Sequence, residues 1–170
     1  RQMCIRDRSK APTYWKKART YLSKKDSIMR SLIKKYKDNN LTTRKDVFYS
    51  LCKSIIGQQI SVAAADSVFK KFELACKKKI NPKIVSKLKT SQLKKCGLSR
   101  QKIRGILEMS QKFKDKTFNP RLIPKMSDEE AIMYLSTLRQ IGRWSAEMIL
   151  LFIYNRSNIW PVQDLSLIHI

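Results

Sequence analysis

Asp164 is the residue of this sequence whose position most directly suggests chemistry. It is a single carboxylate in the segment IWPVQDL, which follows a long apolar stretch. A carboxylate held against a reacting centre can stabilise positive charge that develops in a transition state, and it can orient an attacking water molecule. The segment DLSL also has the pattern of a helix start, for which Asp164 would be the N-cap. From the residues alone, we favour the cap over the catalytic role.

A short glycine turn precedes this carboxylate in the sequence LRQIGRWSAE. We expect it to join two helices. The backbone N–H groups of Ile141, Gly142 and Arg143 are expected to be unpaired at the start of the second helix, where the helix dipole favours an anion such as a DNA phosphate. Gly142 would allow the phosphate a close approach, and Arg143 would add a charged contact. Many helical proteins contain such a turn, so taken alone it more often has a structural use.

Trp144 follows the turn and opens an apolar run that continues to Tyr154. Because this run is apolar on nearly every side, it predicts a central, buried helix. The indole of Trp144 has two alternative uses at this place. It can pack in the core, or its face can bind a cationic ring by stacking and cation–π attraction. The residues alone do not favour either use.

The spacing of apolar residues predicts an all-α protein, and the small number of glycines (4) and prolines (5) agrees with it. The expected helices cover residues 13–36 as a helical region and 46–57 as a clear amphipathic helix. Another helix after residue 61 is expected to turn Val62, Ala65, Phe69 and Phe72 inward. Six residues are expected to begin or end helices: Asp26, Gly57, Ser61, Gly97, Ser99 and Ser127, the last forming a capping box with Glu130.

The charge of +24 in 170 residues, with 42% hydrophobic residues, indicates a folded protein with a polyanionic partner, of which nucleic acid is the usual one. The alternative is that the positive charge reflects a bias toward lysine, with the lysines spread over solvated faces.

The four cysteines are widely spaced and His169 is the single histidine, so we expect no metal and no cofactor, and Cys52 is expected in the core. No run is long enough to span a membrane and no signal peptide is visible, so a soluble, cytoplasmic protein is expected. A monomer is expected as well.

Three segments in order, IIGQQIS, LRQIGRWSAEMILLF and IWPVQDLSL, resemble the helix-hairpin-helix DNA glycosylases. The similarity is greatest to the alkylation-repair branch, the 3-methyladenine DNA glycosylase II type, and runs from Tyr14 to Leu167. It implies two helical lobes with a central cleft that receives a flipped nucleotide. It also implies hydrolytic removal of alkylated bases from double-stranded DNA in base excision repair. The family hairpin often reads Gly-Ile-Gly, whereas this sequence has Gln140 in place of the first glycine.

The resemblance also assigns roles to residues. It makes Asp164 the catalytic carboxylate, and Trp144 a stacking partner for a positively charged alkylated base. The branch that also cleaves the strand has a lysine at the place of Trp144, and this chain has no lysine from Met126 to Ile170, so a monofunctional enzyme that uses water is expected. The remaining assignments are phosphate contacts at Gln140, Ile141, Gly142 and Arg143, a wedge loop at Leu98, Ser99 and Arg100, and a cleft turn at Gln58 and Gln59.

Several alternatives stay open. The amides of Gln58 and Gln59 would either read the opposite DNA strand or satisfy the backbone of their own turn. The protein would be a glycosylase of the same fold for a mismatched or deaminated base, or a DNA-binding module without catalysis in which Asp164 is a cap. The expected domain covers residues 11–167, with non-native or unstructured ends at 1–10 and 168–170. The family continues with further helices after the aspartate, so a fragment is expected, and a fragment need not be active.

Overall fold

The computed structural model describes residues 11–39 and 46–164, and all regular structure within these ranges is helical. This confirms the all-α prediction. The helices are α1 (Trp15–Lys25), α2 (Ser27–Lys35), α3 (Val47–Gly57), α4 (Val62–Ala75), α5 (Pro82–Val85), α6 (Thr90–Lys95), α7 (Arg100–Lys114), α8 (Asp128–Ser136) and α9 (Arg143–Phe152), with a short 3₁₀ helix at Ile123–Lys125. None of the helices in these ranges is both long and apolar enough to cross a membrane.

The predicted helix boundaries are confirmed by their hydrogen bonds. Asp26, Ser61 and Ser99 each accept a backbone N–H from the first turn of α2, α4 and α7. Ser127 and Glu130 form the predicted capping box at the start of α8. Gly57 is the last residue of α3, and Gly97 follows α6 with a φ of +93°, the left-handed conformation that favours glycine.

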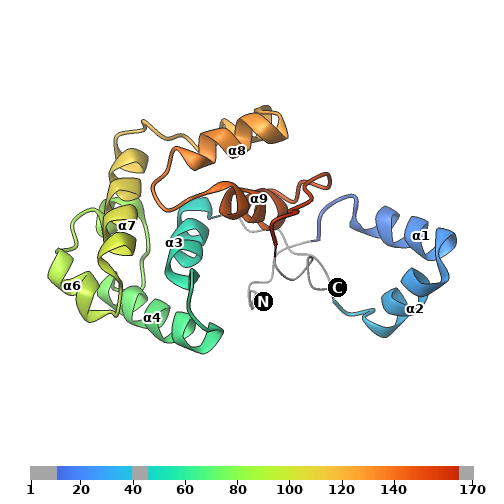
Figure 1. The fold of residues 1–170 in the computed structure, drawn as a ribbon, viewed down its shortest axis with the longest axis horizontal. Helices are drawn as coiled ribbons and strands as arrows, with labels where there is room; N and C mark the ends of the chain where they lie inside the picture. Colours follow the sequence, from blue (N-terminus) through green and yellow to red (C-terminus); the bar gives the residue numbers. More distant parts are fainter. Residues whose placement is uncertain (1–10, 40–45, 165–170) are drawn as a thin grey trace.

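The core lies where α3, α4, α7, α8 and α9 meet, and α9 packs against both α8 and α3 (Figure 1). Its largest fully buried side chains include Leu51, Ile55, Phe72, Ile106, Leu135 and Leu150. Cys52 is buried as predicted, and so are Cys76 and Cys96. Val62 does not face inward as expected but is 46% exposed, because it is the first residue of α4 and precedes the part of that helix that meets the core.

A chain of aromatic rings ties the helices of the core together. Phe48 on α3 meets Phe113 on α7 with ring centroids 5.1 Å apart, and Phe113 meets Phe118 at the same distance. Phe118 stacks on Tyr134 of α8 at 4.6 Å, and the Tyr134 hydroxyl accepts the N–H of Asn119 at 2.7 Å. Such ring pairs add directional contacts to the burial of apolar area. The rings therefore fix α8 against α3 and α7, and with it the start of the segment that carries the glycine turn.

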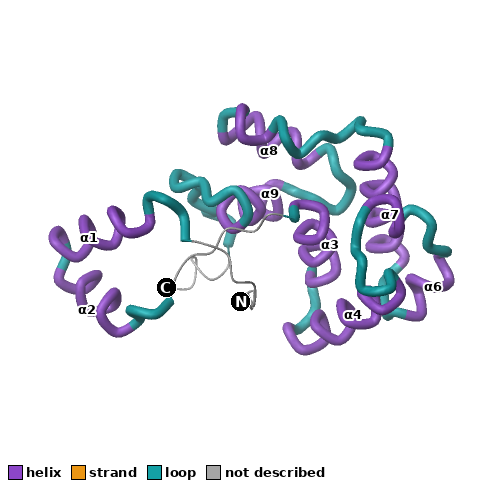
Figure 2. Tube along the Cα trace, turned by 180° about the vertical axis from the view of Figure 1, so that it is seen from behind, coloured by secondary structure: helices purple, strands orange, loops and turns teal. Residues whose placement is uncertain are grey.

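Helices α1 and α2 pack on each other and stand apart from the other helices (Figures 1 and 2). Neither contributes a buried residue. The Tyr14 hydroxyl, just before α1, donates a 2.9 Å hydrogen bond to the carbonyl oxygen of Asn155. This bond joins the N-terminal helix pair to the segment that follows α9.

Candidate active site

Asp164 and Trp144, which the sequence presents twenty positions apart, lie in contact. The indole Nε1–H of Trp144 donates a 3.1 Å hydrogen bond to Oδ2 of Asp164. Trp144 is the second residue of α9, and its side chain is 38% exposed. Core packing therefore does not account for this tryptophan. The two residues form a partly exposed site with an aromatic face beside a carboxylate.

A tight turn presents Asp164. Its N–H donates to the carbonyl oxygen of Pro161 at 2.9 Å, and both Pro161 and Ile159 are buried. Trp160, which lies between them in the sequence, does not anchor the turn, since its side chain is 73% exposed. The helix that Asp164 would cap lies outside the described residues.

Arg156 fixes the segment between α9 and this turn. Its guanidinium donates to Asp128 Oδ1 at 2.6 Å and to the carbonyl oxygens of Ile123 and Met126 at 2.6 and 2.7 Å. The Tyr154 hydroxyl donates to the carbonyl oxygen of Pro120 at 3.1 Å, and burial raises the pKa of Tyr154 to about 12. A planar guanidinium that satisfies several acceptors has a defined position. The path of the chain toward Asp164 is thus set by contacts with residues before and at the start of α8.

The glycine turn between α8 and α9 leaves backbone donors unpaired. Gly142 is the N-cap of α9 and provides no side-chain cap. Among the described residues, no acceptor is bonded to the N–H groups of Gly142, Arg143 or Trp144. The expectation for Ile141 is wrong: its N–H donates to the carbonyl oxygen of Leu138 at 3.0 Å, and its side chain is buried. The turn closes with this bond, so the free donors begin one residue later than predicted.

Gln140 takes up the backbone conformation that a glycine at its place would favour, with a φ of 70°. Its side chain lies over Gly105 of α7. A Cβ built on Gly105 would come within 2.8 Å of the Gln140 Cγ and 3.3 Å of the Arg139 carbonyl oxygen. The missing glycine in the hairpin is therefore accommodated by a glycine in the helix beneath it. Gly142 differs, because a Cβ built there meets nothing within 4 Å.

The cleft turn after α3 is bonded to the hairpin. Gln58 Nε2 donates to the carbonyl oxygen of Gln140 at 2.7 Å, so this amide satisfies the backbone of the hairpin rather than that of its own turn. Lys102 of α7 donates its Nζ to the carbonyl oxygens of Ile56 and Gln58, both at 2.8 Å, and burial lowers the pKa of this lysine. Gln59 is exposed with a φ of 57°. Of the two glutamines, Gln59 is the one whose amide faces solvent.

Arg143 is paired with two carboxylates. Its guanidinium donates to both carboxylate oxygens of Glu129 on α8, with Nη1 to Oε2 at 2.9 Å, and its Nε lies 3.2 Å from Glu147 Oε1. The ion pair with Glu129 raises the pKa of Arg143 and lowers that of Glu129. The Glu147 side chain is 6% exposed, and no partner among the described residues bonds its Oε2. Sequence reasoning took α9 as apolar and missed Glu147, although the spacing Arg143–Glu147 is that of an i, i+4 ion pair.

The predicted wedge loop is divided by burial. Leu98 is 4% exposed and belongs to the core, whereas Ser99 and Arg100 are exposed at the start of α7. Ser99 is engaged as the cap of that helix, where it accepts the N–H of Lys102. Arg100 is thus the member of this loop with a long side chain on the surface.

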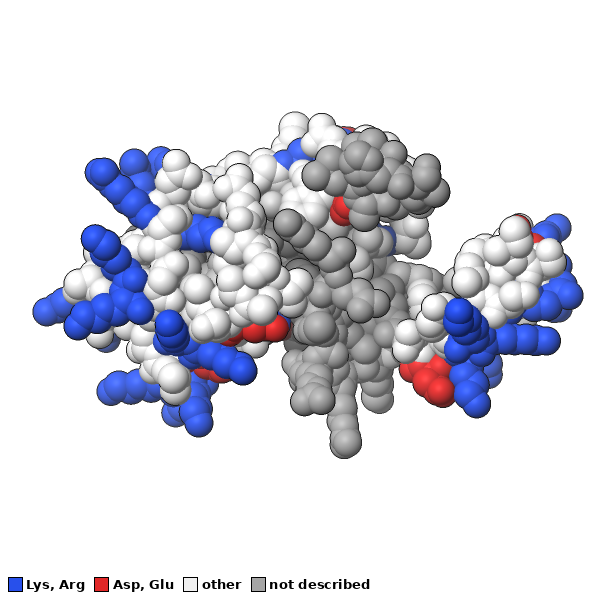
Figure 3. Space-filling model, turned by 60° about the horizontal axis from the view of Figure 1, so that its bottom comes forward, with Lys and Arg blue, Asp and Glu red and all other residues white. Residues whose placement is uncertain are grey.

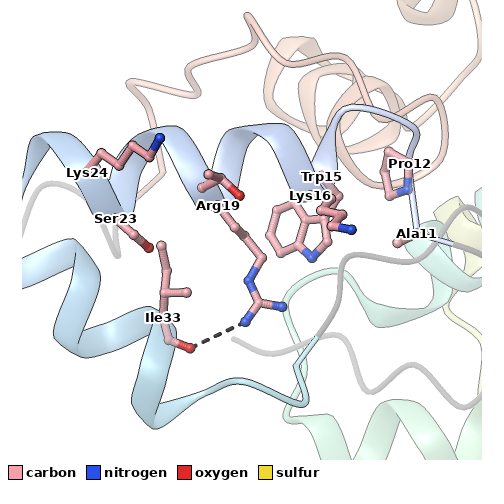
Figure 4. A pocket seen from close by; sticks show the side chains of 9 residues that line it. Ala11, Pro12, Trp15, Lys16, Arg19, Ser23, Lys24 and Ile33 are labelled. Atoms are coloured by element: carbon pink, nitrogen blue, oxygen red, sulfur yellow. Dashed lines mark hydrogen bonds between the residues drawn. The ribbon is translucent and has the colours of Figure 1, made fainter.

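A cavity of about 650 Å³ lies between α1 and α2, away from these residues. Figure 4 shows Trp15 and Arg19 along it. Arg19 donates to the carbonyl oxygens of Ile33, at 3.4 Å, and Lys37, at 3.1 Å, so its guanidinium binds backbone acceptors near the C-terminal end of α2.

Within the described ranges, no group of three or more His, Cys, Asp or Glu residues is arranged to hold a metal ion.

Basic side chains extend from both ends of the molecule. On the face shown in Figure 3, lysines and arginines project from the end formed by α4 to α6 and from the α1–α2 end. Exposed lysines at the first end include Lys94 and Lys95 on α6, close to Ser99 and Arg100. This distribution agrees with the spread of lysine runs in the sequence. A polyanion long enough to reach one end or both would be attracted.

Comparison with known proteins identifies the family. Residues 52–170 match the model of the HhH-GPD superfamily base excision DNA repair proteins. The chain is 28% identical to DNA-3-methyladenine glycosylase 1 of Schizosaccharomyces pombe, over 96% of this chain and 74% of that protein. It is 30% identical to the alkylbase DNA glycosidase-like protein mag2 of the same organism, over 90% of this chain and 75% of that protein.

A solved structure agrees with this result. The S. pombe 3-methyladenine DNA glycosylase Mag1 in complex with abasic DNA superposes with a TM-score of 0.68 at 25% identity, over 88% of this chain and 76% of that one. The fold and the sequence thus lead to the same group of proteins, and the predicted resemblance is confirmed. The chain belongs to the HhH-GPD superfamily of base excision DNA repair proteins, in its alkylation-repair branch.

Proposed function

We propose that this protein is a monofunctional DNA glycosylase that hydrolyses the bond between deoxyribose and an alkylated purine of the 3-methyladenine type. The observation that carries the proposal is the contact between Asp164 and Trp144 at the start of α9. Cleavage of an N-glycosidic bond builds positive charge on the sugar, and a carboxylate facing that sugar stabilises the transition state more than the ground state. The same carboxylate orients the water that attacks.

Trp144 supplies the complementary contact for the base. Its side chain is 38% exposed, so part of the indole is accessible to a ligand. An alkylated purine such as 3-methyladenine carries positive charge, and a cation over an indole face is attracted by about 0.5 to 2 kcal/mol. A cationic base also departs readily, which reduces the need for a general acid. The pair therefore suits a charged base better than a neutral one.

The DNA backbone is held beside this pair by the hairpin. The N–H groups of Gly142, Arg143 and Trp144 at the start of α9 offer a phosphate site, and the open space over Gly142 permits a close approach. Arg143 contributes less than the sequence suggested, because Glu129 and Glu147 already compensate its charge. Ile141 contributes neither its N–H nor its buried side chain, and Gln140 keeps the turn in shape.

A flipped base leaves a gap in the duplex that some side chain must fill. We assign this role to Arg100, since Leu98 is in the core and Ser99 caps α7. Gln59, exposed after α3, is placed to read the opposite strand, while Gln58 is committed to the hairpin. We expect the protein to act on double-stranded DNA as a monomer.

The test is release of free bases from methylated duplex DNA by a chain extended to the full length of its relatives. We expect 3-methyladenine among the products, identified by chromatography, and an abasic site left in an intact strand. A duplex with a mismatched or deaminated base, treated in parallel, should release its base much more slowly than the methylated duplex releases 3-methyladenine. Binding to DNA without release of any base would contradict the proposal and leave a DNA-binding module. Release from the mismatched duplex alone would assign another lesion to the same fold.

A further inference from the structure

The hydrogen bond between Trp144 and Asp164 gives the tryptophan a second use besides stacking. An indole N–H is a donor only, and a bond from it to a carboxylate is strengthened by the charge of the acceptor. In this structure it holds Oδ2 of Asp164 at 3.1 Å. The carboxylate has two oxygens, so fixing one sets the direction of the other. We infer that Trp144 is a positioning residue that aims the Asp164 carboxylate at the reacting sugar.

The place of the two residues in the fold shows why such a bond is needed. Asp164 lies at the end of a turn rather than on a helix, and its N–H donates to the carbonyl oxygen of Pro161. Trp144 lies in the first turn of α9, whose later residues are in the core. The indole is therefore held by a rigid helix, and its hydrogen bond fixes the position of a carboxylate that lies on a loop. Catalytic groups must be held within roughly 0.5 Å of the productive geometry, and loops alone hold them less well than helices do.

The two uses of Trp144 depend on different parts of the ring. Stacking on a cationic base uses the aromatic face, whereas positioning uses the N–H. Trp144→Phe keeps an aromatic face and removes the donor. This inference rests on the proposed function, and the substitution separates it from stacking within that function.

A structural explanation of the hydrogen bond must be tested as well. In that explanation, the bond between Trp144 and Asp164 only anchors residues 155–164 to α9 and has no effect on the direction of the carboxylate. Tyr14→Phe is the matched control, because it removes another long-range bond to this segment, from the Tyr14 hydroxyl to the Asn155 carbonyl oxygen, without touching the carboxylate. If anchoring alone mattered, both substitutions would slow the reaction in the same way.

The experiment measures two quantities on methylated duplex DNA, the single-turnover rate of base release and the Kd. We expect Trp144→Phe to lower the rate by roughly ten- to a hundredfold, with the Kd changed less than about twofold. Tyr14→Phe should keep the wild-type rate. Combined with Asp164→Asn, Trp144→Phe should cause no further loss, because a positioning residue has no effect once its carboxylate is gone. A wild-type rate with a weaker Kd, or an equal loss in Tyr14→Phe, would overturn the inference.

A spectroscopic readout distinguishes this inference from the proposed function. The indole N–H of Trp144 should be protected from hydrogen exchange in the wild type and lose that protection in Asp164→Ala. An inactive wild type with a protected indole N–H would count against the glycosylase activity but not against the contact. An indole N–H that exchanges equally fast in both proteins would refute the positioning role whatever the activity.

Discussion

The charge of Asp164, rather than its shape, is what the proposed reaction requires. Asn is nearly isosteric with Asp and caps a helix about as well. Asp164→Asn should therefore leave the melting temperature and the Kd for DNA almost unchanged while the rate of base release falls by about 10²-fold or more. Single-turnover release of 3-methyladenine, measured beside thermal unfolding, checks this expectation.

The cap interpretation of Asp164 makes the opposite prediction. If the residue only starts a helix, Asn would be tolerated in both stability and activity, and Ala would cost about 1 kcal/mol of stability. The Asn and Ala variants together thus separate a catalytic carboxylate from a cap. Near wild-type release by the Asn variant would end the catalytic assignment.

The proposed type of reaction also depends on Trp144. A lysine at this place would attack the sugar and form a Schiff base, but the nearest lysine before it in the sequence is Lys125. Lys102, at the cleft turn, is held by the carbonyl oxygens of Ile56 and Gln58. We expect no strand cleavage and no covalent adduct on borohydride treatment during turnover. A trapped protein–DNA adduct that persists in Asp164→Asn would show that the enzyme is not monofunctional.

Residue types and order in the sequence were sufficient to select both members of the candidate site, but not to show that they touch. Trp144 could equally have been a core residue, since nothing in a local pattern tells which face of an apolar helix meets a later loop. Glu147 was missed for a related reason. A single acid in an apolar run has little effect on periodicity, although its partner Arg143 lies one turn earlier.

At the level of elements, two glycines near the hairpin should behave differently. Gly105→Ala places a Cβ within 2.8 Å of Gln140 and 3.3 Å of a backbone carbonyl oxygen, so it should destabilise the fold by about 1 to 3 kcal/mol. Gly142→Ser has open space for its side chain, and its hydroxyl is able to cap the free N–H groups of α9. The melting temperature of Gly142→Ser should equal or exceed that of the wild type. Its DNA binding should weaken, because the serine hydroxyl competes with phosphate for the N–H groups of α9. Tight DNA binding by Gly142→Ser would argue against a phosphate at this turn.

The pairing of α8 with α9 through Glu129 and Arg143 should affect DNA binding measurably. A phosphate that contacts Arg143 must compete with Glu129, which is exposed and bonds both ends of the guanidinium. Glu129→Gln should therefore strengthen binding to duplex DNA by about two- to fivefold at low salt. In an Arg143→Ala background the same substitution should have little effect, and the difference between the two backgrounds is the measurement. Equal strengthening of DNA binding in both backgrounds would mean that Glu129 weakens binding through its repulsion of the DNA and not through its ion pair with Arg143.

At the scale of the whole molecule, caps and periodicity predicted most helices, because each depends on residues within one or two turns. The prediction failed where long-range packing or closure of a turn decided the outcome. Val62 is exposed at the start of α4, and the Ile141 N–H is used to close the hairpin. Gln140, in the hairpin, packs on Gly105 of α7, which is far from it in the sequence. The sequence alone therefore could not show that Gly105 makes room for a glutamine in place of the usual hairpin glycine.

The excess of positive charge is a property of the whole chain, and its use can be tested by salt. Each phosphate neutralised on duplex DNA contributes about −0.9 to the slope of log K against log salt. We expect a steep negative slope for undamaged duplex, and a nearly flat plot would show that the lysines only solvate the surface. The Kd measured between about 50 and 200 mM salt provides the test.

Two matched double substitutions locate the DNA on the molecule. Lys94 and Lys95 are exposed on α6, shortly before Arg100, whereas Lys16 and Lys17 are exposed on α1, in the helix pair that stands apart. If Arg100 enters the duplex, the α6 pair, which precedes it closely in the sequence, should lie nearer to phosphates than the pair on α1, and charges interact over about 8 Å at physiological salt. Replacing Lys94 and Lys95 by Gln should then make the slope shallower by about two, and replacing Lys16 and Lys17 should change it less. The reverse order would place the duplex at the α1–α2 end and remove Arg100 as the wedge, because both pairs carry the same charge and differ only in where they lie.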